Sequence, residues 1–392
     1  MNFNYYMPSK ILFGAGKLNE LATERLPGEK ALIVIGQGSS MKKYGYLDRL
    51  TNILQDRNIS FVLFDKILPN PIKSHIMEAS KLAREEKCDF VIGLGGGSSI
   101  DAAKSIAVMA KNPGDYWDYV GGGSGKGKPV ENGALPVVAI TTTAGTGTEA
   151  DPWTVVTKED TNEKIGFGNE YTFPVLSVVD PELMLSVPAN LTAYQGFDAF
   201  FHSAEGYIAT VATPLSDILA LKSIELIAKF LPACVKDGSN LEARTQVALA
   251  NTLAGMVEST SSCTSEHSME HALSAWHHEL PHGAGLIMLS EAYFTFFADK
   301  VPERLADMAK AMGIDTDALP EKNRAMSFVK ALVKLQEDCG VRNIKMSDYG
   351  IKQEEIPVLA DNAHTTMGGL YTVDPYRLTV KDTIKVMTEA YK

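Results

Sequence analysis

The chain has 392 residues, of which 45% are hydrophobic and 22% are charged, so its composition is that of a folded globular protein. Its net charge of −11 argues against nucleic acid as a partner, because binding to phosphates needs a basic surface. No apolar stretch approaches the length of a membrane span, so no membrane partner is expected either. The four cysteines are far apart and form no Cys-x-x-Cys pair, which predicts a reduced, cytoplasmic protein.

The first half of the chain alternates short apolar stretches with helical patterns. This alternation predicts a parallel sheet that is covered by helices on both faces. Four strands are expected at residues 30–35, 59–64, 89–94 and 135–140. Two of the intervening helices are expected at residues 75–86 and 99–110.

The second half of the chain has long helical patterns and almost no strands. The clearest helices are expected at residues 192–211, 215–231, 241–259 and 302–312. The change of pattern predicts a domain boundary near residues 181–188, and the length of the chain is sufficient for two domains.

Two Gly-rich loops follow apolar strands in the first half, at Gly95–Lys104 and at Thr141–Thr148. Ligands of open parallel sheets bind at the carboxyl ends of the strands, and the amides at a helix start attract phosphate. Each loop alone could merely reverse the chain, but the two together favour a nucleotide site. Gly122–Lys128 resembles a P-loop, yet Pro129 replaces the required Ser or Thr and no strand precedes it, so we interpret it as a flexible loop within residues 121–128.

Histidines are concentrated in one short stretch of the second half, which contains five of the eight in the chain: His267, His271, His277, His278 and His282. Upstream, Asp198 and His202 are four residues apart and would share one face of a helix. One carboxylate with several imidazoles suits a divalent metal such as iron or zinc. Spacing alone does not choose among the five downstream histidines. The isolated His75 and His364 are interpreted as ordinary histidines.

Five motifs, in this order, resemble those of the iron-containing (group III) alcohol dehydrogenases over essentially the whole chain: Gly95–Lys104, Thr141–Glu149, Asp198-x-x-x-His202, His267-x-Met-x-His271 and Pro281-His282-Gly283. The resemblance implies the fold that this family shares with dehydroquinate synthase. Residues 1–184 would form an α/β, Rossmann-like dinucleotide-binding domain, and residues 185–392 an all-α metal-binding and catalytic domain, with a cleft between them.

The resemblance also implies a metal site made of Asp198, His202, His267 and His282. The expected metal is Fe²⁺, although Zn²⁺ or another divalent ion would also suit these ligands. His278 remains a rival for the fourth position. His271 would then lie near the nicotinamide and the substrate, and it is the candidate for relaying a proton.

The residues expected to bind the cofactor are Gly36, Gly38, Ser39, Ser40, Pro69, Asn70, Gly95, Gly96, Gly97, Ser98, Asp101, Thr141, Thr142, Gly145, Thr146 and Lys164. Relatives that prefer NAD have an acidic residue at the end of the strand expected here at residues 30–35, where this chain has Gly36. We therefore expect NADP(H) to be preferred over NAD(H). Alignment from the motifs brings Trp153, Glu258 and Leu370 to the expected substrate pocket.

The function that the resemblance implies is that of a metal-dependent alcohol dehydrogenase or aldehyde reductase, which transfers hydride between NAD(P)H and a small aldehyde or alcohol. The alternatives are a glycerol dehydrogenase-like polyol oxidoreductase, a dehydroquinate synthase-like lyase and a non-catalytic nucleotide-binding protein. A homodimer or larger homo-oligomer is expected.

Overall fold

The computed structural model describes residues 2–392 and divides into two compact units. The first, called the α/β unit, consists of Met7–Thr143 and Gly147–Ser186. The second, called the helical unit, consists of residues 2–6, Ala144–Thr146 and Val187–Lys392. The last passage from the α/β unit to the helical unit lies between Ser186 and Val187. The sequence predicted this boundary between residues 184 and 185.

A six-stranded parallel sheet forms the centre of the α/β unit, with strand order β1-β8-β5-β4-β2-β3. Its strands are β1 (Lys10–Phe13), β2 (Lys30–Gly36), β3 (Ser60–Ile67), β4 (Phe90–Gly95), β5 (Val137–Thr141) and β8 (Leu176–Val179). The four strands expected from the sequence are β2 to β5. A separate antiparallel hairpin consists of β6 (Thr154–Lys158) and β7 (Glu163–Phe167).

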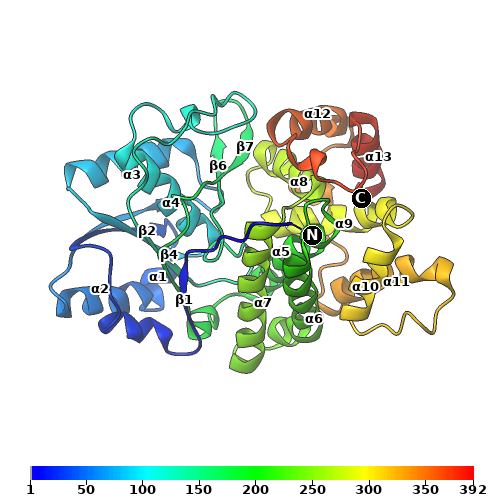
Figure 1. Ribbon diagram of the computed structural model, residues 1–392, viewed down its shortest axis with the longest axis horizontal. Helices are drawn as coiled ribbons and strands as arrows, with labels where there is room; N and C mark the ends of the chain where they lie inside the picture. Colours follow the sequence, from blue (N-terminus) through cyan, green and yellow to red (C-terminus); the bar gives the residue numbers. More distant parts are fainter. Residues whose placement is uncertain (1) are drawn as a thin grey trace. The chain divides into compact units, whose positions relative to one another are not determined.

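Helices cover both faces of this sheet (Figure 1). They are α1 (Ser40–Lys43), α2 (Tyr46–Asp56), α3 (Lys73–Glu85) and α4 (Gly97–Lys111), with 3₁₀ turns η1 (Lys17–Ala22), η2 (Tyr116–Asp118) and η3 (Pro181–Met184). Ile33 of β2 points into the apolar cluster that contains Leu18 of η1 and Leu50 of α2. On the opposite face, α4 lies so close to β4 that a Cβ on Gly93 would come within 2.9 Å of Ile100 Cα. Covering on both faces explains why β2 and β4 are apolar without alternation.

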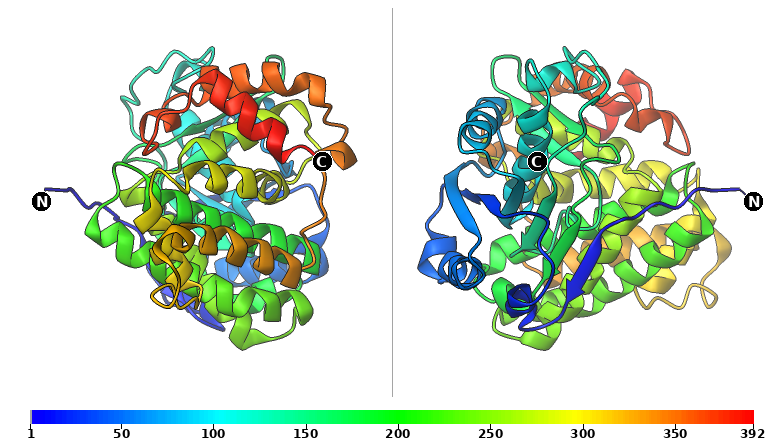
Figure 2. Two further views of the ribbon diagram at one scale, coloured as in Figure 1. Left: turned by 90° about the vertical axis from the view of Figure 1, so that its right-hand side faces the viewer. Right: turned by 60° about the vertical axis from the view of Figure 1, so that its left-hand side comes forward.

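The helical unit has no strand among the residues that the structure describes. Its helices are α5 (Ala189–Ile208), α6 (Pro214–Lys236), α7 (Leu241–Thr260), α8 (Ser265–Trp276), α9 (His282–Phe297), α10 (Pro302–Ala311), α11 (Glu321–Asp338), α12 (Ile356–Thr366) and α13 (Val380–Ala390), with 3₁₀ turns η4 (Met346–Tyr349), η5 (Gln353–Glu355) and η6 (Leu370–Thr372). Figure 2 shows these helices in green to red, with α12 and α13 packed together near the C-terminus. None of the described helices is both long and apolar enough to cross a membrane.

Helix α5 lies at the centre of the helical unit because glycines allow its neighbours to approach closely. A Cβ on Gly206 would lie 2.3 Å from Val257 Cγ1 of α7, and a Cβ on Gly196 would lie 2.3 Å from Leu231 Cδ1 of α6. Phenylalanines of α5, among them Phe200, are fully buried and stack in the apolar core. Close packing on several sides fixes the helix that carries the first two predicted metal ligands.

The loop at residues 121–128, expected to be flexible, is tied down by hydrogen bonds. The amides of Lys126, Gly127 and Lys128 donate to backbone carbonyls of residues 117, 120 and 118. The carboxylate of Glu163 accepts bonds from the amide and hydroxyl of Ser124. No helix begins directly after this loop, so it lacks the strand–loop–helix context of a P-loop.

Candidate metal centre

Three helices supply the four predicted metal ligands. Asp198 and His202 lie one turn apart on α5 and are 3% and 5% exposed. His267 is in the first turn of α8, and His282 is the first residue of α9. Pro281 provides an extended residue before α9, so the chain turns sharply into the helix at His282.

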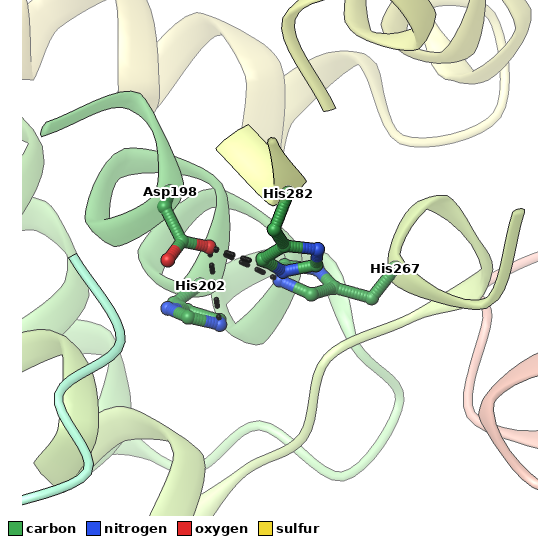
Figure 3. Close-up of side chains that lie close together, drawn as sticks. All are labelled: Asp198, His202, His267 and His282. Atoms are coloured by element: carbon green, nitrogen blue, oxygen red, sulfur yellow. Dashed lines mark ion pairs between the residues drawn. The ribbon is translucent and has the colours of Figure 1, made fainter. Parts of the chain in front are cut away.

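The four side chains converge on one point (Figure 3). One ligand atom from each lies within 4.8 Å of all the others. Asp198 Oδ1 is 3.6 Å from Nε2 of His202, 3.7 Å from Nε2 of His267 and 3.4 Å from Nε2 of His282.

These distances are longer than hydrogen bonds from ring nitrogen to oxygen, which are about 2.7–3.2 Å. Asp198 Oδ1 and His267 Nε2 are buried and have no hydrogen-bond partner. Two donor atoms that are each about 2.1 Å from a tetrahedral cation lie about 3.4 Å apart. The spacing therefore fits a cation held between the side chains better than direct bonds among them.

The other ring nitrogen of each histidine is held by the protein. Nδ1 of His267 contacts the carboxylate of Glu205, and Nδ1 of His282 contacts the carboxylate of Glu270. Nδ1 of His202 lies 3.2 Å from the carbonyl oxygen of Gly145. Such partners fix the tautomer with Nε2 deprotonated and facing inward, which is the form that binds a metal.

Glu205 and Glu270 were not among the residues predicted from the sequence. Glu205 could have been found, because it is seven residues after Asp198 and so lies on the same face of α5 as Asp198 and His202. Glu270 could not, since it faces His282, which comes from another helix after a turn. Both glutamates are fully buried.

Burial also tunes the protonation of the centre. Burial lowers the pKa of His202 to about 3, although the charge of Asp198 opposes this shift. The ring is therefore neutral at neutral pH and offers a lone pair. Burial by itself would raise the pKa of Asp198, but the neighbouring imidazoles, His202 foremost, hold it well below its usual value, so the carboxylate is ionised.

The other histidines of the 267–282 stretch lie differently. His271 is buried on α8, and its ring centroid is 5.4 Å from that of His282. His277 Nε2 lies 3.2 Å from Glu355 Oε2. His278 is exposed in the turn before α9 and does not belong to the four-residue cluster.

The two isolated histidines lie outside the cluster, in agreement with their interpretation as ordinary histidines. His75 lies edge-on to Phe64, and His364 stacks on Tyr371 with the ring centroids 3.7 Å apart. Neither is among the described groups of residues that could hold a metal.

Most of the predicted cofactor residues lie at one edge of the sheet of the α/β unit. The strands are parallel and in register, with Gly36 beside Ile67 and Gly95 beside Thr141. The carboxyl ends of β2, β3, β4 and β5 therefore lie at the same edge of the sheet. These strand ends and the residues that follow them include Gly36, Gly38, Ser39, Ser40, Pro69, Asn70, Gly95, Gly96, Gly97, Ser98, Thr141 and Thr142. The hydroxyl of Ser98 donates to the carbonyl of Pro69. Gly95 has φ +148°, where a side chain would also collide with Ser99.

The remaining predicted cofactor residues lie elsewhere. The carboxylate of Asp101 is buried in α4 and accepts bonds from the hydroxyl of Thr148 at 2.7 Å and the amide of Val155 at 2.9 Å. Gly145 and Thr146 belong to the helical unit, and Lys164 is buried on β7. Burial raises the pKa of Asp101 to about 6.

The three residues predicted for the substrate pocket come from both units. Trp153 is in the α/β unit and is 40% exposed, and its carbonyl accepts a bond of 2.7 Å from the buried ammonium of Lys104. Glu258 is on α7, with Oε1 3.4 Å from Nδ1 of His202. Leu370 begins η6 and is half-buried.

Residues 8–181 match the family described as iron-containing alcohol dehydrogenase, and residues 192–391 match the C-terminal family of Fe-containing alcohol dehydrogenases. The chain therefore belongs to the iron-containing alcohol dehydrogenase family. The function implied by the resemblance, metal-dependent alcohol dehydrogenase, is confirmed at that level, and the lyase alternative is not favoured.

Individual relatives agree with this assignment. The chain is 34% identical over 365 residues to the 1,3-propanediol dehydrogenase of Citrobacter freundii, covering 92% of each chain. It is 31% identical over 389 residues to the NAD-dependent methanol dehydrogenase of Bacillus methanolicus, covering 99% of each. Among solved structures, an archaeal halo-thermophilic alcohol dehydrogenase from a Red Sea brine pool matches with a TM-score of 0.94 and 33% identity, over 100% of this chain and 99% of that one. The expected fold class is confirmed.

Proposed function

We propose that this protein transfers hydride reversibly between a nicotinamide cofactor and a small alcohol or aldehyde, at a metal held by Asp198, His202, His267 and His282. The observation that carries the proposal is the arrangement of their inner donor atoms, 3.4–3.7 Å from Asp198 Oδ1. The relatives named above as 1,3-propanediol and methanol dehydrogenases support a small alcohol as substrate.

The chain's own residues prepare the centre for this reaction. A divalent cation bound there supplies Lewis-acid chemistry, which polarises the substrate oxygen and lowers the pKa of an alcohol. One carboxylate with three neutral imidazoles compensates only part of a double positive charge, so the centre stays electrophilic. Glu205 and Glu270 hold two of the rings in place. We propose iron as the metal because the family is described as iron-containing.

His271 is our candidate for moving the proton that leaves or joins the substrate oxygen. It is buried beside His282 but is not part of the four-residue cluster. A histidine has a pKa near neutrality when unperturbed, which suits general acid–base work. The proposal is that His271 passes the proton toward solvent without binding the metal.

The glycine loops at the carboxyl edge of the sheet are proposed to hold the cofactor. Helix α4 begins at Gly97, directly after β4, and presents its first amides at this edge. Helix N-termini attract phosphate through these amides and through the helix dipole. This arrangement supports a pyrophosphate position beside Gly95–Ser98.

We also propose that NADP(H) is preferred over NAD(H). At the end of β2, Gly36 carries no carboxylate that would repel a 2′-phosphate, and a Cβ there would meet only Ile67 O, at 3.5 Å. The nearby Asp65 is paired with Lys42 at 2.6 Å, and Lys43 lies 5.3 Å from the centroid of the Tyr44 ring. One relative is named for NAD, so this preference needs its own test.

The test is a panel of small aldehydes and alcohols with NADPH and NADH, on protein reconstituted anaerobically with Fe(II) or Zn(II). We expect turnover by the loaded protein and none by the metal-free protein. Absence of turnover with every pair would contradict the function. For the cofactor, Gly36→Asp should shift the ratio of kcat/KM toward NADH, whereas the uncharged Gly36→Ser should shift it less. A wild type that already favours NADH would refute the preference.

We also propose a cytoplasmic location and a homo-oligomeric assembly. All four cysteines are free thiols, which suits the reducing cytoplasm. A homodimer or larger homo-oligomer is the expected assembly, and sedimentation of the purified chain measures it directly.

A further inference from the structure

A buried carboxyl group outside the four-residue cluster is bonded to two of the helices that carry the predicted metal ligands. Asp374 lies in the segment between η6 and α13 and is 4% exposed. Its Oδ1 accepts a bond of 3.1 Å from the amide of Ser265, the first residue of α8. The same oxygen accepts a bond of 3.1 Å from the hydroxyl of Tyr293 on α9. One atom thus joins the helix of His267 to the helix of His282.

The segment that carries Asp374 is also bonded to the end of α5, the helix of Asp198 and His202. The carbonyl of Val373 accepts bonds from the amide of Thr210 at 2.8 Å and from the hydroxyl of Thr210 at 3.1 Å. Thr210 lies just beyond the last residue of α5. All three ligand-bearing helices are therefore tied to the backbone or the side chain of residues 373 and 374.

Helix α8 depends on such partners because it has no cap of its own. Its N-cap residue, Thr264, makes no side-chain bond to the first turn, and the first amides of a helix have no partner within it. Glu205 of α5 accepts bonds through Oε2 from the amide of Thr264 at 2.7 Å and from its hydroxyl at 2.9 Å. The next amide, that of Ser265, donates to Asp374. Because Oε1 of Glu205 contacts Nδ1 of His267, the ligand ring and the start of its helix share these carboxyl partners.

The hydroxyl of Tyr293 connects the two carboxyl groups. It donates to Asp374 and lies 2.8 Å from Oγ1 of Thr264, which in turn donates to Glu205. Glu205, Thr264 and Tyr293 are fully buried. A buried donor that loses its acceptor is costly to leave unpaired, so loss of one member favours a movement of the helices that restores the bonds.

We propose that Asp374 and Tyr293 are positioning residues for the proposed metal centre, on which this inference rests. They hold α5, α8 and α9 at the distances at which Asp198, His267 and His282 converge on one cation. Metal sites tolerate ligand displacements of only about 0.2 Å, so a small movement of α8 is sufficient to weaken binding. Neither positioning residue belongs to the four-residue cluster, so both act through the helices and not as ligands.

Two substitutions of Asp374 separate its bonds from its mere presence. Asp374→Leu removes the acceptor, whereas Asp374→Asn keeps an oxygen that can accept the same two bonds. The affinity of the full-length chain for Co(II) is measured by competition with a chelator, and the visible absorption of bound Co(II) reports the ligand geometry. Asp374→Leu should bind Co(II) about 10-fold more weakly than wild type and with an altered spectrum. Asp374→Asn should match wild type in both.

Tyr293→Phe is the second test and removes a single oxygen. It should weaken Co(II) binding and alter the spectrum in the same direction as Asp374→Leu. The matched control is Tyr116→Phe, which removes an equally buried hydroxyl that is bonded to Ser105 in the α/β unit. This control should keep the affinity and the spectrum of wild type. If Asp374→Leu does not fold, the comparison of Tyr293→Phe with Tyr116→Phe decides.

The Tm of each metal-free variant distinguishes positioning from general stabilisation. A lower Tm in Asp374→Leu and Tyr293→Phe, with the affinity and spectrum of wild type, would overturn the proposal, because the two residues would then only stabilise the fold. Equal weakening in Asp374→Asn and Asp374→Leu would also overturn it. A wild type that binds no Co(II) would instead contradict the proposed metal centre itself, and this inference with it.

Discussion

Gly283, the residue after the predicted ligand His282, allows a close approach that places this ligand. A Cβ at this position would lie 2.1 Å from the carbonyl oxygen of Tyr194 on α5, whereas ordinary contacts are 3.4 Å or more. In Gly283→Ala, α9 and α5 must therefore separate locally by about 1 Å. Metal sites tolerate ligand displacements of only about 0.2 Å. We therefore expect this variant to lose most of its bound metal.

The free energy of unfolding gives a second readout. Alanine has a higher helix propensity than glycine by up to about 1 kcal/mol, so propensity alone would stabilise the variant. Overpacking of a tight contact costs about 1–3 kcal/mol, so the clash should win and lower the stability. Gly369→Ala is the matched control, because Gly369 has helical φ −58° and nothing lies within 4 Å of its Cβ position.

The assay combines metal analysis of the purified proteins with thermal unfolding of the metal-free forms. Gly283→Ala should have a lower metal content and a lower Tm than Gly369→Ala. If Gly283→Ala keeps the metal content of wild type, the seating of His282 does not depend on this contact, and the reasoning is refuted.

Three other variants test the surroundings of the centre. Glu270→Gln should weaken metal affinity by about 10–100-fold in chelator competition, because His282 loses the carboxylate that contacts its Nδ1. The control Glu279→Gln, at an exposed position, should keep the affinity of wild type. Equal affinities of the two variants would contradict this prediction. His271→Ala should keep the metal but lower kcat by about 10²–10⁴-fold, and an unchanged pH–rate profile would leave His271 only a structural role. Burial raises the pKa of Asp374 from 3.8 to about 7. The contribution of this group to the free energy of unfolding is therefore fully present below pH 4 and is lost as the pH rises to 7. Between pH 5 and pH 7 the loss is on the order of 3 kcal/mol. Asp374→Asn should therefore gain stability relative to wild type across that range in denaturant titrations, and parallel pH curves would count against it.

Periodicity of apolar residues was sufficient to predict the strands β2, β3, β4 and β5 and the helices α5, α6, α7 and α10. It did not reveal β1 or β8, which have four residues each, because so short a strand contains no repeating pattern. It also missed α8. In that helix Ser265, Glu266, His267, Ser268 and Glu270 are all buried, so polar residues occupy positions where the pattern requires apolar ones. Of these residues, His267 belongs to the candidate metal cluster and Glu270 contacts His282.

The sequence predicted the residues of the candidate site but not the partners that hold their rings. Helical spacing predicted that Asp198 and His202 would share a face, and the motif resemblance, not spacing, selected His282 over the other histidines. The partners of the rings depend on contacts across turns and between helices. Glu270 reaches His282 only because α8 and α9 pack together, and Gly145 reaches His202 from far upstream in the chain. Neither contact has a counterpart in local sequence spacing.

We propose that His282, and not the neighbouring His278, completes a metal centre on which the reaction depends. The most direct measurement is the metal content and aldehyde reductase activity of His282→Ala and His278→Ala, purified and reconstituted side by side with wild type. We expect His282→Ala to lose both metal and turnover, while His278→Ala, altered at an exposed position, should keep both. Full metal content in His282→Ala together with loss of metal in His278→Ala would contradict it.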